Sequence, residues 1–549
     1  MRRARPVNRK MALLLVSALA AACGGGGMGS SDSSGTPPGQ TPPPTQPPPP
    51  TSSATDVTTY KYDVARTGAN LTETTLTPAN VNASGFGLLR VLMTDGKVDA
   101  QPLYLSALSV QGASHNVLYV ASENDSVYAF DADSGNTLWH VSLLGSGETP
   151  SEPVGGCGQI SPKIGITSTP VIDRSAGALF VVAMSKDGAG NYYHRLHALD
   201  VTTGAELLNG PVTISGSFPV RGGSMQFEPR QYAERAALLL SQGMLYLSFT
   251  SHCDAPPYSG WVMAYRESSL AQAATFNAAP NSGGAGPAIW MAGGGPAADA
   301  AGNVYLLTAN GAFETSLDGN GFPSQSDYGN SFLKLSGSTL AVSDYFSMSN
   351  TVSESNADQD LGSGGILLLP DLTDAGDAVQ HLAIGAGKDG NLYVVSRDAL
   401  GKFDPSANHI YQELDGVLAG GIWSTPAYYQ QTVYYGPNGG TLRAFTISAA
   451  RLSTGSASTI PYPYPGTSPS VSANGASNGI VWAHENSNPA VLHAYDAGDL
   501  AHELYNSSQA ANTRDHFGAG NKFITPMVAG GRVFVGTTNG VAEFGLLGQ

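Results

Sequence analysis

VLYVASENDSVYAFDADSGNTLWHVSL, residues 117–143, is the stretch that decides the fold. Alternation of apolar and polar residues predicts three strands there, Val117–Ala121, Ser126–Asp131 and Thr137–Leu143. The turn at 133–135 ends in Gly and begins with Asp, which are residues that supply hairpin geometry. The stretch therefore predicts a small antiparallel sheet.

The same order of strands and turns recurs along the rest of the chain. The further copies span residues 178–207, 243–270, 303–340, 381–403, 432–448, 479–505 and 532–547. Several copies follow a short strand that opens with Pro, at Gln101–Tyr104, Ser168–Val171, Ser424–Ala427 and Ile524–Met527. Four strands per unit, repeated over about 490 residues, predict an all-β fold, a β-propeller with eight blades; seven is the alternative count. The last copy lacks its outer strand, which we expect residues near Thr58–Tyr62 to supply.

The N-terminal region has the pattern of an export signal. Residues 1–22 combine a basic start with a 12-residue apolar run, which is too short to span a bilayer. Cys23 follows small residues, as in a bacterial lipobox, and predicts lipidation of an envelope protein at the outer membrane; an ordinary signal peptide is the alternative. Residues 23–56 are rich in Gly, Ser and Pro and predict a linker, so that residues 57–549 form the folded body.

The charge of the chain excludes some partners. The 549 residues include 42 acidic and 26 basic ones, for a net charge of −16, which becomes −21 without residues 1–22. Phosphate binding requires clustered Lys and Arg. We therefore expect no nucleic-acid partner, membrane contact only through the lipid anchor, and a monomer.

The repeat resembles that of the quinoprotein alcohol dehydrogenase-like superfamily. The approach to the first blade is also similar, in Tyr62–Asn70 and Leu76–Val81. The resemblance implies an eight-bladed propeller that holds pyrroloquinoline quinone (PQQ) and Ca²⁺ at its axis and oxidises an alcohol or a sugar. Envelope lipoproteins that assist outer-membrane assembly use the same repeat without catalysis. A binding or scaffold protein for an envelope protein is therefore the alternative function.

The resemblance also implies roles for individual residues. Asn310 and Asp254 correspond to ligands of Ca²⁺, Asp360 to the catalytic base, and Lys388 to the cation that contacts the quinone. Each residue has a structural alternative, because Asp before Leu-Gly, Asn before Gly and Lys-Asp-Gly all occur in ordinary turns.

Two elements of the dehydrogenase pattern are missing. The pair of adjacent cysteines that covers one face of the quinone is reduced to Cys157, and the Gly293–Gly295 triplet is followed by Pro296 rather than leading to a Trp. Cys157 and Cys253 lie in neighbouring predicted blades and can form a disulfide in an oxidising compartment.

Residues that precede the inner strands should converge at one mouth of the propeller. Those collected in this way are Gln101, Thr167, Ser168, Arg230, Gln231, Trp290, Asp360, Trp423, Ser424 and Lys522. Polar groups and two Trp around a central cleft are typical of a small-molecule pocket, and we expect Trp290 and Trp423 to contact the cofactor. A polar, water-filled axis without a ligand is the alternative.

Overall fold

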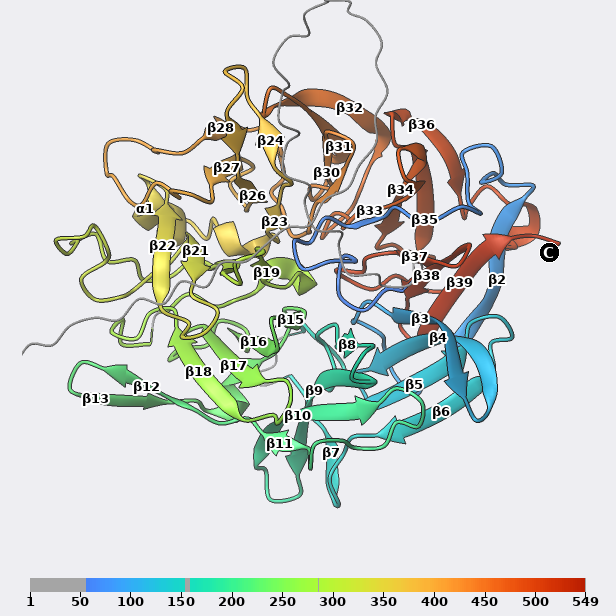
Figure 1. Cartoon of the computed structure of the whole chain (residues 1–549), viewed down its shortest axis with the longest axis horizontal. Helices are drawn as coiled ribbons and strands as arrows, with labels where there is room; N and C mark the ends of the chain where they lie inside the picture. Colours follow the sequence, from blue (N-terminus) through green and yellow to red (C-terminus); the bar gives the residue numbers. More distant parts are fainter. Residues whose placement is uncertain (1–55, 154–157, 285, 549) are drawn as a thin grey trace, which may run out of the picture. The chain divides into compact units, whose positions relative to one another are not determined.

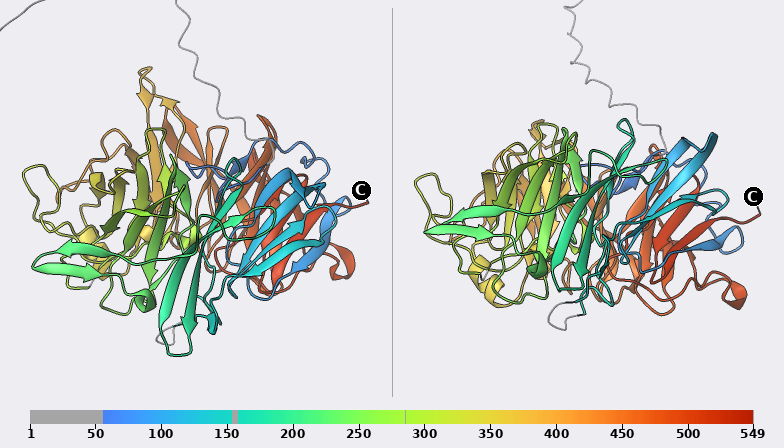
Figure 2. Two further views of the ribbon diagram at one scale, coloured as in Figure 1. Left: turned by 60° about the horizontal axis from the view of Figure 1, so that its bottom comes forward. Right: turned by 90° about the horizontal axis from the view of Figure 1, so that it is seen from below.

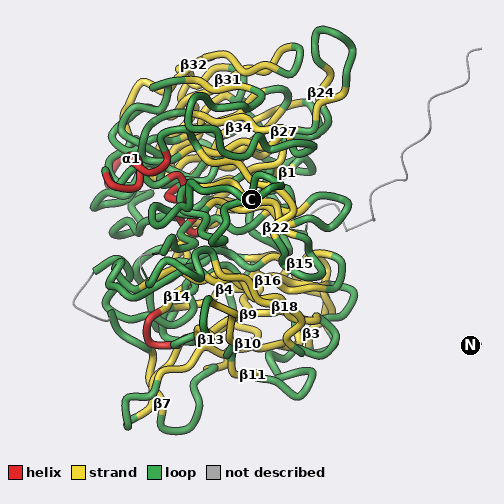
Figure 3. The backbone as a smooth tube through the Cα atoms, turned by 90° about the vertical axis from the view of Figure 1, so that its left-hand side faces the viewer, coloured by secondary structure: helices red, strands yellow, loops and turns green. Residues whose placement is uncertain are grey.

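The computed structural model describes residues 56–153, 158–284 and 286–548, and the chain divides into two units, Met1–Thr51 and Ser52–Gln549. The predicted signal sequence, Cys23 and most of the predicted linker lie outside the described residues. In the second unit eight sheets stand in a ring, so the β-propeller and the count of eight blades are confirmed (Figure 1). The side views show the strands of the blades joined by many loops and turns (Figures 2 and 3). Among the described residues the helices are short, the α-helix being α1 (Thr351–Asn356), and none could cross a membrane.

Each blade has one strand near the axis (Figure 1). Blade 1 consists of β3 (Leu103–Val110), β4 (Ala113–Ser122), β5 (Ser126–Asp131) and β6 (Thr137–Ser142). Blade 2 consists of β7 (Glu148–Pro150), β8 (Val171–Asp173), β9 (Ala178–Asp187), β10 (Tyr192–Asp200) and β11 (Val212–Thr213). Blade 3 consists of β14 (Tyr232–Ala233), β15 (Leu239–Ser241), β16 (Met244–Ser251), β17 (Trp261–Arg266) and β18 (Gln272–Asn277). Blade 4 consists of β19 (Ala297–Ala298), β20 (Val304–Leu307), β21 (Ser331–Leu335) and β22 (Val342–Ser347).

The second half of the ring repeats the arrangement. Blade 5 consists of β23 (Leu367–Leu368), β26 (Leu382–Ala386), β27 (Leu392–Ser396) and β28 (Gln412–Leu414). Blade 6 consists of β29 (Ala427–Tyr429), β30 (Thr432–Tyr435), β31 (Thr441–Ser448) and β32 (Arg451–Pro461). Blade 7 consists of β33 (Ser470–Asn474), β34 (Ser477–Glu485), β35 (Val491–Asp496) and β36 (Asp499–Asn506), with β1 (Ala69–Asn70) added parallel to β33. Two hairpins are inserted between blades, β12–β13 (Ser217–Val220 and Gly223–Gln226) and β24–β25 (Leu372–Thr373 and Val379–Gln380).

The eighth blade joins the two ends of the body. It consists of β37 (Met527–Ala529), β38 (Arg532–Gly536) and β39 (Gly540–Leu546), with β2 (Phe86–Met93) as the outer strand. The expectation that residues near Thr58–Tyr62 supply this strand was wrong. Tyr60 and Lys61 are buried at the axis, whereas β2 pairs antiparallel with β39 from Phe86–Leu546 to Met93–Gly540. An N-terminal segment therefore closes the ring, as expected, but this segment is β2 rather than Thr58–Tyr62.

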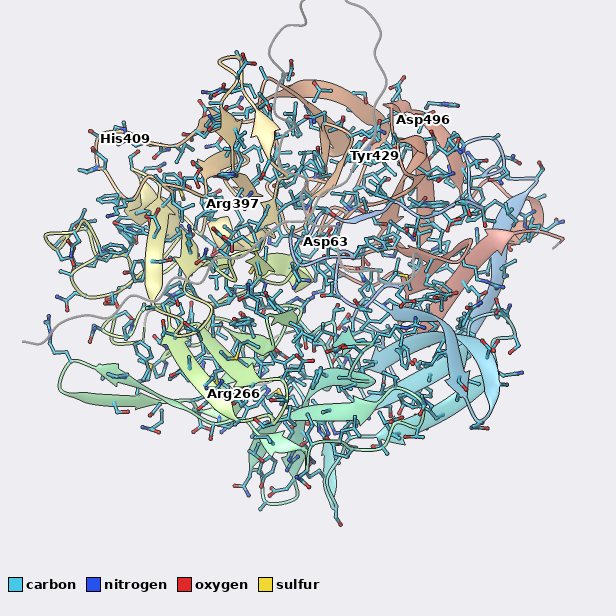
Figure 4. The ribbon with its side chains drawn as sticks, viewed as in Figure 1. Asp63, Arg266, Arg397, His409, Tyr429 and Asp496 are labelled. Carbon is cyan, nitrogen blue, oxygen red and sulfur yellow. The ribbon has the colours of Figure 1, made fainter. Side chains whose placement is uncertain are left out.

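Residues 57–73, which we call the axial strap, run along the inner strands of the ring. Their backbone exchanges hydrogen bonds of 2.7–2.9 Å with residues of six blades, namely Tyr104, Ile172, Ala298, Leu368, Tyr428 and Val471. The strap reaches the remaining two blades through side chains. Arg66 Nη2 donates to the Leu238 carbonyl (3.1 Å) and Asn70 Nδ2 to the Val528 carbonyl (2.9 Å). One segment therefore connects all eight blades near the axis, where Figure 4 labels its Asp63.

Apolar side chains fill the space between neighbouring blades, and one contact shows how a repeat fixes its neighbour. Trp139 in blade 1 donates from Nε1 to the Val201 carbonyl of blade 2 (3.1 Å), and its ring lies against Gly204. A β-carbon at Gly204 would lie 2.7 Å from the Trp139 ring, and the backbone there has a φ of +72°. The repeat's Gly is therefore required both by conformation and by the docking of the Trp.

We expect Gly204→Ala to lower the free energy of unfolding by about 1–3 kcal/mol, since it adds overpacking to an unfavourable φ. Urea unfolding followed by Trp fluorescence measures this change. Gly177→Ala provides the control, because its φ is +64° but no atom lies within 4 Å of the added carbon. Equal losses in the two variants would show that Trp docking contributes nothing.

Candidate functional site

A cavity opens at the axis, and it brings together six of the residues predicted from the sequence, Asp254, Trp290, Asp360, Lys388, Trp423 and Lys522. Its walls are formed by Gln159, Arg235, Asp254, Trp290, Ala292, Asp360, Ser363, Lys388, Trp423, Tyr464, Lys522 and Phe523. Most of these residues come from loops that precede inner strands, whereas Asp254 and Lys388 come from loops between two strands of one blade. The predicted catalytic residue, the three predicted cofactor contacts and one of the two predicted metal ligands thus line one site.

Asp360 is buried and has a defined partner for each oxygen. Its Oδ1 accepts a hydrogen bond from the backbone N–H of Asn310 (2.6 Å), and its Oδ2 lies 2.5 Å from Lys388 Nζ. Burial raises the pKa of Asp360, and although Lys388 and the Asn310 N–H act against it, the net shift is upward. A carboxylate with a raised pKa at the wall of a cavity is suited to accept a proton.

Lys388 holds two carboxylates at once. Its ammonium group lies 2.5 Å from Asp360 and 2.9 Å from Asp358 Oδ1, and 5.9 Å above the centre of the Trp423 ring. Burial lowers the pKa of Lys388, but the two carboxylates outweigh it and the net shift is upward. The ammonium group is therefore a permanent positive charge at the cavity wall.

The loop that carries Asp360 is fixed by buried Asn330. Its amide donates to the Gln359 carbonyl (3.2 Å) and accepts from the Leu361 N–H (3.0 Å). Gly387 allows the neighbouring turn to approach, because a β-carbon there would lie 2.2 Å from the Asp360 carbonyl oxygen. The Gly387-Lys388 sequence therefore combines a close backbone approach with a cation directed at the carboxylate.

Positive charge gathers on another part of the wall. Arg235 is buried, its guanidinium stacks 4.1 Å from the Phe523 ring centre, and among the described residues its Nη1 has no hydrogen-bond partner. Burial lowers the pKa of Lys522, and repulsion from Arg235 and Lys97 lowers it further. A buried guanidinium nitrogen without an acceptor is costly, and an anionic ligand would supply that acceptor.

Carboxyl groups compensate this charge only in part. Asp99 accepts from Asn521 Nδ2 (2.6 Å) and lies 2.8 Å from Lys97 Nζ. Burial raises its pKa, but the charges of Lys97 and Arg235 and a hydrogen bond with Glu123 hold it below the usual range. Burial and the adjacent Asp99 raise the pKa of Glu123 well above its usual value. The three cations Lys97, Arg235 and Lys522 thus face two acidic side chains, Asp99 and Glu123.

The axial strap lies beneath this region. A cavity of about 10 Å³, sufficient for one water, is lined by Tyr60 of the strap together with Asp99, Arg235 and Phe523. Because Arg235 and Phe523 also line the larger cavity, the strap lies on the far side of its floor. Ligands of that cavity therefore meet a closed floor.

The structure separates the other predicted residues. Asn310 lies behind Asp360 and donates from Nδ2 to Asp358 (2.8 Å), outside the cavity lining. Gln101 and Thr167 line the small lower cavity, Ser168 donates to Glu234 (2.7 Å), and Ser424 donates to the Gly436 carbonyl (3.1 Å). Arg230 and Gln231 line two other depressions, at the side of blade 2 and beside blade 3.

Cys253 is disulfide-bonded, while the predicted partner Cys157 lies outside the described residues, so their pairing stays a prediction.

Sequence reasoning missed Arg235, Tyr464 and Phe523. Arg235 precedes inner strand β15, as Asp360 precedes β23, but blade 3 lacks the Pro-containing opening that marked blades 1, 2, 6 and 8. Phe523 adjoins the predicted Lys522, and Tyr464 stands in the run Pro461–Pro465, which carried no repeat signal. Tyr464 is 49 % exposed and lies edge-on to Trp423, with ring centres 5.8 Å apart.

The lining suits PQQ in its chemistry. A planar tricarboxylate requires cations and flat apolar walls, which Arg235, Lys522, Lys388 and the aromatic side chains offer. The open volume is about 90 Å³, below the range of about 300–1,000 Å³ usual for ligand pockets, so binding requires rim side chains such as Tyr464 to rotate outward. Oxygen donors of the kind that Ca²⁺ prefers are present in Asp254, Asp360 and Asn310. One oxygen of Asp360 faces Lys388, and the described residues contain no cluster of three His, Cys, Asp or Glu placed to hold a metal.

Glu234, next to Arg235 in sequence, leads to a prediction about pH. It is buried with Ser168 as its hydrogen-bond donor, and burial raises its pKa to about 8 from 4.5. The stability that Glu234 contributes is therefore fully present below about pH 4.5 and is lost as pH rises through about 8. We expect the wild-type protein to lose roughly 3 kcal/mol of unfolding free energy between pH 4.5 and 7, and Glu234→Gln to show no such loss. Urea unfolding across this pH range measures the difference.

Glu228→Gln, at an exposed position, is the control and should keep the pH dependence of the wild type. The same pH dependence in Glu234→Gln would contradict the prediction.

Comparisons with known proteins agree with the fold. A family model described as outer membrane protein assembly factor BamB matches residues 61–207, which include most of the strap, blade 1 and part of blade 2. No curated protein matches the chain. Quinohemoprotein alcohol dehydrogenase from Comamonas testosteroni is similar in structure, with 14 % identity, a TM-score of 0.60 and coverage of 90 % of this chain and 80 % of that one.

Two other dehydrogenase structures are similar to the same extent. Quinohemoprotein alcohol dehydrogenase ADHIIG from Pseudomonas putida HK5 has 13 % identity, a TM-score of 0.61 and coverage of 90 % of this chain and 81 % of that one. A europium-containing methanol dehydrogenase has 14 % identity, a TM-score of 0.58 and coverage of 90 % of this chain and 98 % of that one. The resemblance to the quinoprotein alcohol dehydrogenase-like superfamily is thereby confirmed for the repeat and the fold.

Proposed function

We propose that the protein is a PQQ-dependent oxidoreductase that oxidises an alcohol or a sugar in the axial cavity. The observation that carries the proposal is the cavity itself. Buried Asp360, paired with Lys388, lies in one wall, and the unpaired guanidinium nitrogen of Arg235 lies in another. The carboxylate that would accept the proton and the guanidinium group that would bind an anion therefore line the same cavity.

Each group has a role in this proposal. PQQ, when bound, supplies a two-electron acceptor that becomes the quinol as the substrate alcohol becomes a carbonyl compound. Arg235 and Lys522 would hold its carboxylates, and Trp290 and Trp423 would contact its ring. Asp360 would accept the hydroxyl proton of the substrate at the lone pair of Oδ2 that Lys388 does not occupy. Asp254 and the amide oxygen of Asn310 would hold Ca²⁺.

The test is reconstitution with PQQ and Ca²⁺, followed by an assay of dye reduction with a panel of primary alcohols and aldoses. Turnover that requires PQQ supports the proposal. Absence of turnover with every substrate, in protein shown to bind PQQ, would reject it and favour the second candidate.

The second candidate is a non-catalytic binding protein of the cell envelope. The match of residues 61–207 to the assembly-factor model favours it, because that match covers blade 1 and part of blade 2 rather than the residues around Asp360. Affinity capture from envelope extracts, with one reproducible protein partner, would support it.

We also propose export and lipid attachment at Cys23, on the sequence pattern alone. Metabolic labelling with an alkyne fatty acid should mark the wild-type protein and not Cys23→Ser. Equal labelling of both would contradict the proposal.

A further inference from the structure

A second depression, the hairpin groove, lies beside the axial cavity. We define it by Val220, Gln231, Pro257, Tyr258, Asn281 and Gln325, and its volume is about 600 Å³. This volume lies within the range of small-molecule binding sites. One of its walls is the inserted hairpin β12–β13, which projects beside β18 in Figure 1. Insertions into one repeat of a repeat protein are frequently used for binding.

The hairpin is fixed against blade 3. Gln272 Nε2 donates to the Ser215 carbonyl (2.8 Å) and Thr275 Oγ1 to the Ser217 carbonyl (3.3 Å). At the tip, the N–H of Arg221 donates to Asn281 Oδ1 (2.7 Å). The hairpin therefore stands as a wall of fixed position.

The opposite wall is fixed as well. Asn281 Nδ2 donates to the Gln325 carbonyl (2.7 Å), and the Tyr258 N–H donates to the Gly284 carbonyl (3.0 Å). The groove thus exists before any ligand binds, which reduces the entropic cost of binding.

The lining is neutral and combines rings with amides. Tyr258, Pro257 and Pro280 offer flat apolar surface, and the single charges of Arg221 and Glu228 are opposite in sign. Among the described residues, the side-chain amide of Gln325 has no hydrogen-bond partner, so its donors and its acceptor are available to a ligand. Side-chain amides both donate hydrogen bonds to hydroxyl groups and accept hydrogen bonds from them, and aromatic faces attract C–H groups. A neutral sugar ring offers both kinds of group.

The groove adjoins the proposed active site. Gln231 in the groove donates from Nε2 to the carbonyl of Ala255, next to Asp254 of the axial cavity. The same short segment contributes Asp254 to the axial cavity and Pro257 and Tyr258 to the groove. The two sites therefore lie at opposite ends of the segment Asp254–Tyr258.

We propose that the hairpin groove binds the inner residues of a neutral oligosaccharide whose terminal ring enters the axial cavity. The assignment of this oligosaccharide as substrate rests on the proposed function, but binding in the groove does not. The substrate class would then be a sugar chain rather than a small alcohol.

Isothermal titration of the protein without PQQ tests the proposal, with maltohexaose, cellohexaose, xylohexaose and chitohexaose as probes. We expect at least one to bind with a submillimolar dissociation constant, and to bind tenfold or more weakly to Tyr258→Ala and Gln325→Ala. Gln430→Ala, at an exposed position of blade 6 that lines neither the groove nor the axial cavity, is the matched control and should change the dissociation constant less than threefold. Melting temperatures confirm that each variant is folded.

No binding at 10 mM by any probe would overturn the proposal, as would binding that the two groove variants leave unchanged. A peptide with the sequence of residues 36–50 serves as the alternative ligand, and its binding in the groove in place of the sugars would also overturn it. If sugars bind but the reconstituted protein oxidises nothing, the groove stands as a sugar site and only its place in catalysis fails.

Discussion

Asp360→Asn should lower the turnover of the reconstituted protein by a factor of about 10²–10⁴, which is the usual contribution of a positioned general base. The amide is close in shape to the carboxylate and still accepts from the Asn310 N–H. PQQ binding should therefore change little, while the proton acceptor is lost. Steady-state dye reduction at saturating substrate measures the effect.

Asp358→Asn is the matched control. Asp358 also accepts from Lys388 Nζ at 2.9 Å, but its side chain is 77 % exposed and does not line the cavity. We expect less than a threefold loss of turnover. Because the pKa of Asp360 is raised, the wild-type kcat/KM should rise with pH through a value above the ordinary 3.8. Equal losses in both variants would show that Asp360 is not the base.

Arg66→Ala should lower the free energy of unfolding by about 3–5 kcal/mol, as expected when a buried charged network is broken. Arg66 is fully buried in the axial strap. It donates to the carbonyls of Pro296, Tyr60 and Leu238 at 2.9–3.1 Å and to Thr59 Oγ1 at 2.8 Å. Its removal leaves three buried carbonyls without this donor and loosens the strap from blades 3 and 4.

Arg266→Ala is the control for loss of an arginine side chain, since Arg266 is exposed at the end of β17, away from the axis (Figure 4). Its unfolding free energy should stay within about 0.5 kcal/mol of the wild type. Urea unfolding of both variants measures the difference. A loss below 1 kcal/mol for Arg66→Ala would mean that the strap does not hold the ring together.

The fold was predictable because it depends on short-range sequence patterns that recur in every repeat. Strand Ser126–Asp131 has the predicted bounds, since alternation and the flanking turns act within a few residues. The outer strand of blade 8 was not predictable in the same way. Pairing of β2 with β39 joins residues more than 440 positions apart, so no pattern within a few residues marks which N-terminal segment supplies the strand.

The site was predictable where a motif fixes the backbone. Lys388-Asp389-Gly390 and Asp360-Leu361-Gly362 mark turns, and Lys388 pairs with Asp360 because both lie in loops of blade 5, before β23 and between β26 and β27. Arg235 gives no such signal, because its importance depends on burial against Phe523, 288 positions later. Such contacts between distant blades are visible only in the folded ring.

The central claim is that the axial cavity binds PQQ, and a titration of the Cys23→Ser protein with PQQ, followed by quinone absorbance and melting temperature, tests it most directly. We predict saturable binding, with about 2.7 kcal/mol of stabilisation at 100 times the dissociation constant. Arg235→Met and Lys388→Met should each weaken it by tenfold or more. Unchanged absorbance and melting temperature at millimolar PQQ, with and without Ca²⁺, would contradict the account.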